Sequence, residues 1–104
     1  MKKARLVVSD VAAADVLEQA DWYRLQAGQA LALRWERAVN SAVVRLLGRP
    51  AAGTRCKFRS SELTNVRRSV IAGFPKHLMF YKFDEAEVFI LRVVHGARDL
   101  ERLL

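Results

Sequence analysis

The segment Leu91–Leu100, LRVVHGARDL, combines residue types that can do chemistry. It begins as a run of large apolar residues and then places His95, Gly96 and Arg98 in quick succession. Histidine titrates near neutral pH and can act as a general acid or base, whereas arginine carries a permanent charge that suits carboxylates and phosphates. The segment is therefore a catalytic corner, a docking corner, or the end of a strand at which Gly96 supplies a turn.

Other kinds of reactive site are not indicated by the sequence. The single cysteine, Cys56, has no clustered neighbours at metal-ligand spacing. There is no carboxylate cluster and no Gly-rich phosphate loop. We therefore predict neither a metal nor a cofactor, and we interpret Cys56 as a buried or half-buried packing residue.

Length and composition indicate one folded domain over residues 1–104. The apolar fraction of 52% is ample for one modest core. No apolar run is long enough to span a membrane, and MKKARLVVSD is no signal peptide, so a cytoplasmic protein is expected. The net charge of +7, mostly arginine, is divided as +3 over residues 1–53 and +4 over residues 54–104. This positive charge suits nucleic acid or an acidic protein as a partner. The alternative is that it only keeps the protein soluble.

Two helices are predicted in the first half of the chain. After a strand candidate over residues 4–8, Ser9 or Asp10 can cap a helix that ends at Gly28. A second helix follows at once and ends at Gly48, so the pair is expected to form an antiparallel hairpin. Helical spacing predicts the buried stripes to be Val16, Leu17, Ala20, Tyr23 and Ala27, and then Ala32, Trp35, Val39, Ala42, Val43, Leu46 and Leu47.

The second half of the chain changes to a period of two over residues 66–71, 77–83 and 88–94, with short turns between. This pattern predicts a three-stranded antiparallel meander. The fold class is therefore α+β, in the order strand–helix–helix–meander, with the helical hairpin packed on one face of a small sheet. Both faces of the last strand are largely apolar, and two helices can cover only one, so the other face is expected to be partly open and to mark a partner site.

Three cations alternate with smaller or apolar residues between the helices and the meander. In RCKFRSSELTN, Arg55, Lys57 and Arg59 are separated by Cys56 and Phe58. If this piece is extended, the three cations share one side. They are a candidate strip for contacting phosphates, and a solvated loop is the equally weighted alternative.

These residues resemble a known family. Leu91–Leu100, preceded by GFPKHLMFY at residues 73–81, is similar to the carboxy-terminal half of ParE toxins, in the RelE/ParE superfamily of type II toxin–antitoxin systems. The helix predicted over residues 9–26, which contains Asp15, is similar to the family's first helix. The resemblance covers residues 4–101. It implies the fold predicted above, a small acidic or amphipathic antitoxin as partner, and a role in plasmid stabilisation.

The superfamily has two branches with different chemistry. ParE-type toxins are understood to poison DNA gyrase, whereas RelE-type toxins cut messenger RNA on the ribosome without a metal. If this chain were such a ribonuclease, Arg68, His95 and Arg98 would form the active groove. RelE-type toxins usually also have a carboxy-terminal tyrosine or histidine, and this chain ends in RLL at residues 102–104. The resemblance therefore favours a gyrase-binding toxin with no firm catalytic residue, in which His95 latches the turn.

The pattern of residues predicts two binding surfaces. The open sheet face is expected to receive the antitoxin. The tail after the last strand is expected to contact the target, with completion of the core by its leucines as the alternative. The predicted antitoxin-binding residues are Arg68, Leu78, Phe80, Ile90, Arg92 and Val94, and the predicted target-binding residues are Arg98, Leu100, Leu103 and Leu104.

Overall fold

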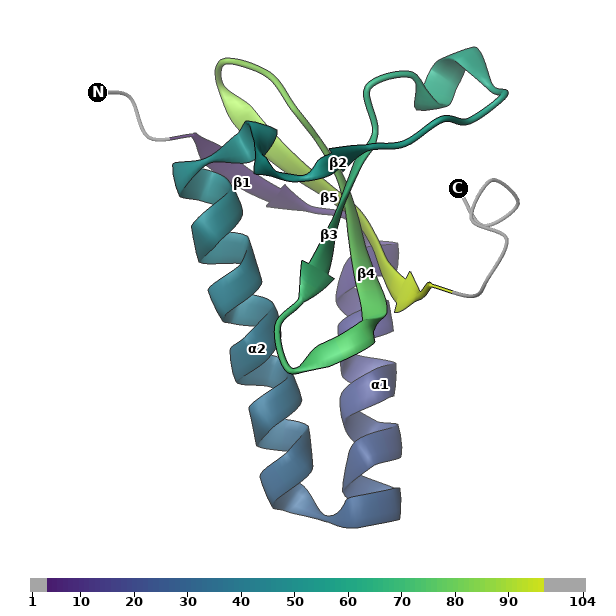
Figure 1. The fold of residues 1–104 in the computed structure, drawn as a ribbon. Coiled ribbons are helices and arrows are strands. Elements are labelled where there is room, and N and C mark those ends of the chain that lie inside the picture. Colours follow the sequence, from purple (N-terminus) through teal and green to yellow (C-terminus); the bar gives the residue numbers. More distant parts are fainter. Residues whose placement is uncertain (1–3, 97–104) are drawn as a thin grey trace.

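The computed structural model describes residues 4–96 of the chain. Two helices, α1 (Asp10–Ala27) and α2 (Gln29–Gly48), follow the first strand, β1 (Arg5–Val8). The Ser9 side chain caps α1 by accepting a hydrogen bond from the Ala12 amide at 3.0 Å. Gly28 is the only residue between the helices, and its φ of 94° allows the sharp reversal that sets them side by side (Figure 1). The predicted hairpin is confirmed.

The buried stripe of α2 matches the prediction better than that of α1. Ala32, Trp35, Val39, Ala42 and Leu46 are buried in α2, with Trp35 fully inaccessible to solvent. In α1 the buried residues are Ala12 and Ala20. Leu17 was predicted to face the core, and this is wrong, because it is 62% exposed.

The sheet has five strands and is mixed. Besides β1, it contains β2 (Thr54–Arg55), β3 (Arg67–Ile71), β4 (Phe74–Phe83) and β5 (Glu87–His95), in the spatial order β1-β5-β4-β3-β2. The strands β3, β4 and β5 form the predicted antiparallel meander. At one edge β1 pairs with β5 in parallel, and at the other the short β2 pairs with β3. Short 3-10 turns, η1 (Pro50–Ala52) and η2 (Ser61–Leu63), flank β2.

Apolar residues are buried on both faces of the sheet. The helices pack on one face, against residues that include Met79, Tyr81 and Ile90. On the opposite face, which we call the helix-free face, a smaller core is formed by Val66, Phe80 and Val94. The half-buried residues Cys56, Phe58, Leu63, Leu78 and Leu91 pack against it. The segment between β2 and β3 therefore covers part of the face that was expected to be open.

A β-bulge in β5 decides which of its side chains face the helices. Phe80 pairs with Arg92, but the next residue of β4, Tyr81, pairs with Ile90, so Leu91 is an extra residue. Alternation is broken there: Ile90 and Val93 belong to the helix-side core, whereas Leu91 and Val94 belong to the helix-free face. The expectation that Ile90 and Val94 share the open face is therefore wrong.

Candidate functional site

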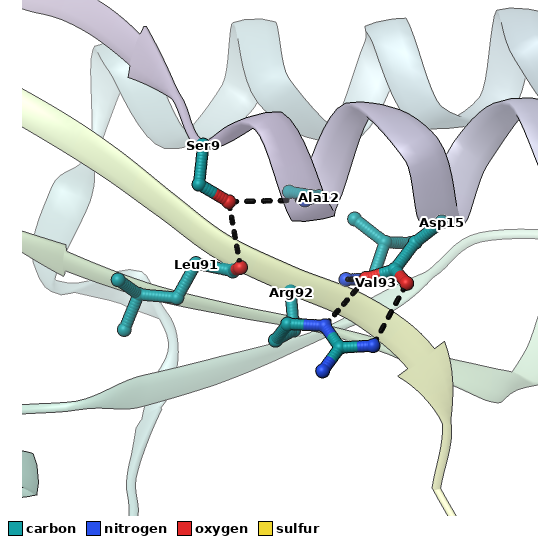
Figure 2. A network of polar contacts seen from close by, with 6 residues as sticks. All are labelled: Ser9, Ala12, Asp15, Leu91, Arg92 and Val93. Carbon is teal, nitrogen blue, oxygen red and sulfur yellow. Dashed lines mark hydrogen bonds and ion pairs between the residues drawn. The ribbon is translucent and has the colours of Figure 1, made fainter. Parts of the chain in front are cut away.

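The end of β5 is fastened to the start of α1 by side chains, because β1 is too short to pair with it there. The last bond of the parallel pairing runs from the Ser9 amide to the Ile90 carbonyl oxygen at 3.0 Å. Beyond it, the Ser9 hydroxyl donates to the Leu91 carbonyl oxygen at 2.9 Å, and the Val93 amide donates to Oδ2 of Asp15 at 3.0 Å (Figure 2). Side chains of the first helical turns thus replace a neighbouring strand along this edge.

Arg92 completes this network. Its Nε donates to Oδ2 of Asp15 at 2.8 Å, and its Nη2 donates to Oδ1 at 2.9 Å (Figure 2). The two side chains are only 14% and 11% exposed, and the hydrogen bonds to Asp15 raise the pKa of Arg92 above its ordinary value. Arg92 is opposite Phe80 and so starts on the helix-free side of the strand, but the expectation that it lies open there is wrong, because its guanidinium is held by Asp15 of α1.

A groove of about 740 Å³ lies between α1, the β3–β4 turn and the end of β5. The residues along it that matter most for its chemistry are Asp15, Glu18, Trp22 and Tyr23 of α1, Lys76 and His77 of β4, and His95 of β5. It therefore combines aromatic, acidic and basic side chains within one hollow.

His77 lies at the base of this groove and is 8% exposed. Its ring centroid is 4.7 Å from that of Trp35, 6.3 Å from that of Tyr23 and 5.7 Å from that of His95, its partner across the strands. Burial, and secondly the nearby His95, lower the pKa of His77 below 6.5. His77 is therefore neutral at pH 7. Sequence reasoning missed this residue, although its place in the helix-facing phase of β4 was a signal for it.

Within residues 4–96, the structure does not bring together Arg68 and His95, two of the three residues expected of a ribonuclease. Arg68 is opposite Phe80 in the sheet and so lies on the helix-free face. His95 is opposite His77, which contacts Trp35 on the helix side. The sheet therefore separates the two, while Arg98 is outside the described residues, as are Leu100, Leu103 and Leu104.

Part of the helix-free face remains accessible beside the small core. Arg68 is exposed and Leu78 is half-buried, as a docking surface requires. Phe80 and Val94 are 1% and 6% exposed, because the segment between β2 and β3 packs over this core, so they are not accessible to a partner. Val70, opposite Leu78 and 52% exposed, extends the accessible surface and was missed, although it continues the alternation of Val66 and Arg68.

The described residues carry neither of two features that would suggest other functions. Within residues 4–96, no three His, Cys, Asp or Glu side chains are grouped so that they could hold a metal ion. None of the described helices is both long and apolar enough to cross a membrane.

Comparisons with known proteins agree with this fold. A solved structure titled "Chromosomal ParDE TA system from P. aeruginosa" superimposes with a TM-score of 0.73, covering 89% of this chain and 96% of that one at 20% sequence identity. Comparison with curated proteins gives no match. A family model described as "ParE toxin of type II toxin-antitoxin system, parDE" matches residues 6–100. Because that match spans nearly the whole sequence, the chain belongs to the ParE toxin family of type II toxin–antitoxin systems.

Proposed function

We propose that the protein acts by binding DNA gyrase and blocking its reaction, without catalysing a reaction of its own. Membership of the ParE toxin family is the observation that carries this proposal. The separation of Arg68 from His95 by the sheet supports it, because metal-free RNA cleavage requires acid, base and cation to converge on one phosphate. Arg98, Leu100, Leu103 and Leu104 are proposed to contact the enzyme.

A cognate antitoxin is proposed to neutralise the toxin through the helix-free face. The accessible residues there, Arg68, Val70 and Leu78, offer one cation and two apolar side chains to a partner with acidic and apolar residues. Each 100 Å² of apolar surface that is covered contributes about 2.5 kcal/mol before the ordering of the antitoxin is subtracted. The guanidinium of Arg92 is already paired with Asp15, so we do not expect it to bind the antitoxin.

The target can be tested in cells that express the toxin under control. Reporter plasmids should lose negative supercoiling or accumulate cleaved DNA before protein synthesis slows, because gyrase acts on DNA directly. Co-expression of the antitoxin should restore both. Early arrest of translation, with messenger RNA cut at the decoding site and plasmid topology unchanged, would contradict the proposal.

A further inference from the structure

The cations Arg55, Lys57 and Arg59, which we call the basic strip, begin in β2 at the edge of the sheet and continue through the irregular segment that follows it, with Arg59 in a bend. Thr54 and Arg55 pair with β3, and the Cys56 amide continues the pattern by donating to the Val66 carbonyl oxygen at 2.9 Å. In extended chain, alternate side chains point to the same side, about 6.6 Å apart. The strip therefore begins on a hydrogen-bonded edge of the sheet.

Packing fixes which side chains point outward. Cys56 and Phe58 are half-buried against the small core on the helix-free face. Arg55, Lys57 and Arg59 are all exposed. Burial raises the pKa of the Cys56 thiol, and nearby Arg68, which is opposite Thr54 and shares the face of Cys56, acts against this rise. The inward residues anchor the chain and the outward residues carry only positive charge.

The charge of the molecule is concentrated around this strip. Residues 49–68 contain six basic residues and one acidic residue, which gives +5 of the chain's net +7. Residues 10–27 contain four acidic residues and one arginine, which gives −3. This separation of charge is not evident when the net charge is counted by halves of the sequence, because the two halves carry +3 and +4. An approaching polyanion is therefore oriented toward the strip and away from α1.

Arg67, near the strip, differs from it because its side chain forms contacts that hold the fold together. Arg67 donates to the carbonyl oxygens of Ala51 and Gly53, at 3.2 and 2.8 Å, and lies over the Phe83 ring. Within residues 4–96, by contrast, neither Arg55 nor Lys57 forms an ion pair with a carboxylate. Their charges are not needed to hold the described fold.

We propose that the basic strip binds the phosphate backbone of a nucleic acid, without reading its sequence. A protein partner would need apolar residues at the centre of the contact, and in the strip those residues, Cys56 and Phe58, are turned inward. Exposed arginine and lysine at regular spacing suit repeated phosphates, because such binding is dominated by charge. This inference does not rest on gyrase as the target, since it concerns the toxin and nucleic acid only.

The test compares two double variants of the full-length toxin, each of which loses two charges. R55Q/K57Q removes charges from the strip, and R34Q/R37Q removes exposed charges from α2. Binding of a short fluorescein-labelled DNA duplex is followed by anisotropy over a range of salt concentrations, with matched single-stranded RNA as a second probe. R55Q/K57Q should weaken binding and lower the slope of log K against log salt by about 2, whereas R34Q/R37Q should leave the slope nearly unchanged.

Both variants should melt like the parent, because neither pair of charges takes part in the described core. Similar losses of affinity for DNA and RNA would identify the backbone as the ligand. Equal losses from the two variants would overturn the inference, because overall charge would then explain binding. Absence of binding by the parent at physiological salt would also overturn it, as would an R55Q/K57Q variant that binds nucleic acid normally and loses only the antitoxin.

Discussion

Asp15 of α1 and Arg92 of β5 form a bidentate ion pair, with contacts of 2.8 and 2.9 Å, between residues 77 positions apart in the sequence. The same carboxylate accepts the Val93 amide. One acidic side chain therefore closes the exposed edge of β5, neutralises the mostly buried guanidinium of Arg92, and holds the helical hairpin against the sheet.

Removing the Asp15 carboxylate should destabilise the fold. Asp15→Ala leaves a mostly buried guanidinium and a strand amide without their partner, at a cost of about 2–3 kcal/mol in unfolding free energy by chemical denaturation. Asp21→Ala, in the same helix, is the matched control. Its ion pair with Arg24 is exposed, at 70% and 41%, and should contribute less than about 1 kcal/mol. Equal costs for the two variants would show that the pair contributes little.

The bulge at Leu91 predicts opposite responses at adjacent positions. Ile90→Asp buries a carboxylate in the helix-side core and should cost about 4 kcal/mol or more, enough to abolish cooperative thermal unfolding. Phe89→Asp changes a side chain that is 39% exposed and should leave a cooperative melt. A stable Ile90→Asp variant would mean that β5 keeps regular alternation and that Ile90 faces outward.

Acidification should weaken the fold through His77. Because its folded pKa lies below the unfolded value of 6.5, the folded state disfavours the proton that the unfolded state accepts. This contribution to stability is complete above pH 6.5 and is lost as the pH falls toward the folded pKa. The melting temperature should decline over that window, and His77→Phe should flatten the decline. His95→Gln should retain most of it, because burial is the larger cause; an unchanged decline in His77→Phe would assign the effect elsewhere.

The accessible part of the helix-free face should control antitoxin binding. Val70→Asp places a charge beside Leu78 and should raise the dissociation constant for the cognate antitoxin about tenfold or more, as measured by calorimetry. Val44→Asp is the control, because it makes the same change on α2 at a side chain that is 66% exposed. If Val44→Asp weakens the complex and Val70→Asp does not, the antitoxin covers the helical hairpin instead.

Local features of this fold could be predicted from the sequence because local residues determine them. Ser9 and Gly28 mark the helix boundaries, and the period of two marks the meander. The pairing of β1 with β5 could not be predicted from such signals, since it joins segments 82 residues apart. The bulge could not be predicted either. Ile90, Leu91, Val93 and Val94 are all apolar, so a strand with or without the bulge would bury a similar apolar surface on each face.

The candidate site residues could likewise be predicted where local residues determine their place, and could not where distant residues do. Leu78 and Arg68 lie on the helix-free face, as the alternation of β4 and β3 indicated, and their role in antitoxin binding stays a prediction. Ile90 was placed on the wrong face because its direction depends on the bulge, and Arg92 was expected to be open because its contact with Asp15 was not foreseen. His77 was overlooked because its burial depends on aromatic residues from other elements, Tyr23 and Trp35.

The central claim, that the protein is a gyrase-binding toxin, is tested most directly by titrating purified, folded toxin into a gyrase supercoiling reaction. Supercoiling should be lost, or cleaved DNA should accumulate, near one toxin per enzyme, and excess antitoxin should reverse the effect. A chain shortened by residues 100–104 should melt like the parent and should not inhibit, since Leu100, Leu103 and Leu104 are proposed to contact gyrase. Full supercoiling in the presence of a stoichiometric excess of folded toxin would show that the toxin does not act on gyrase.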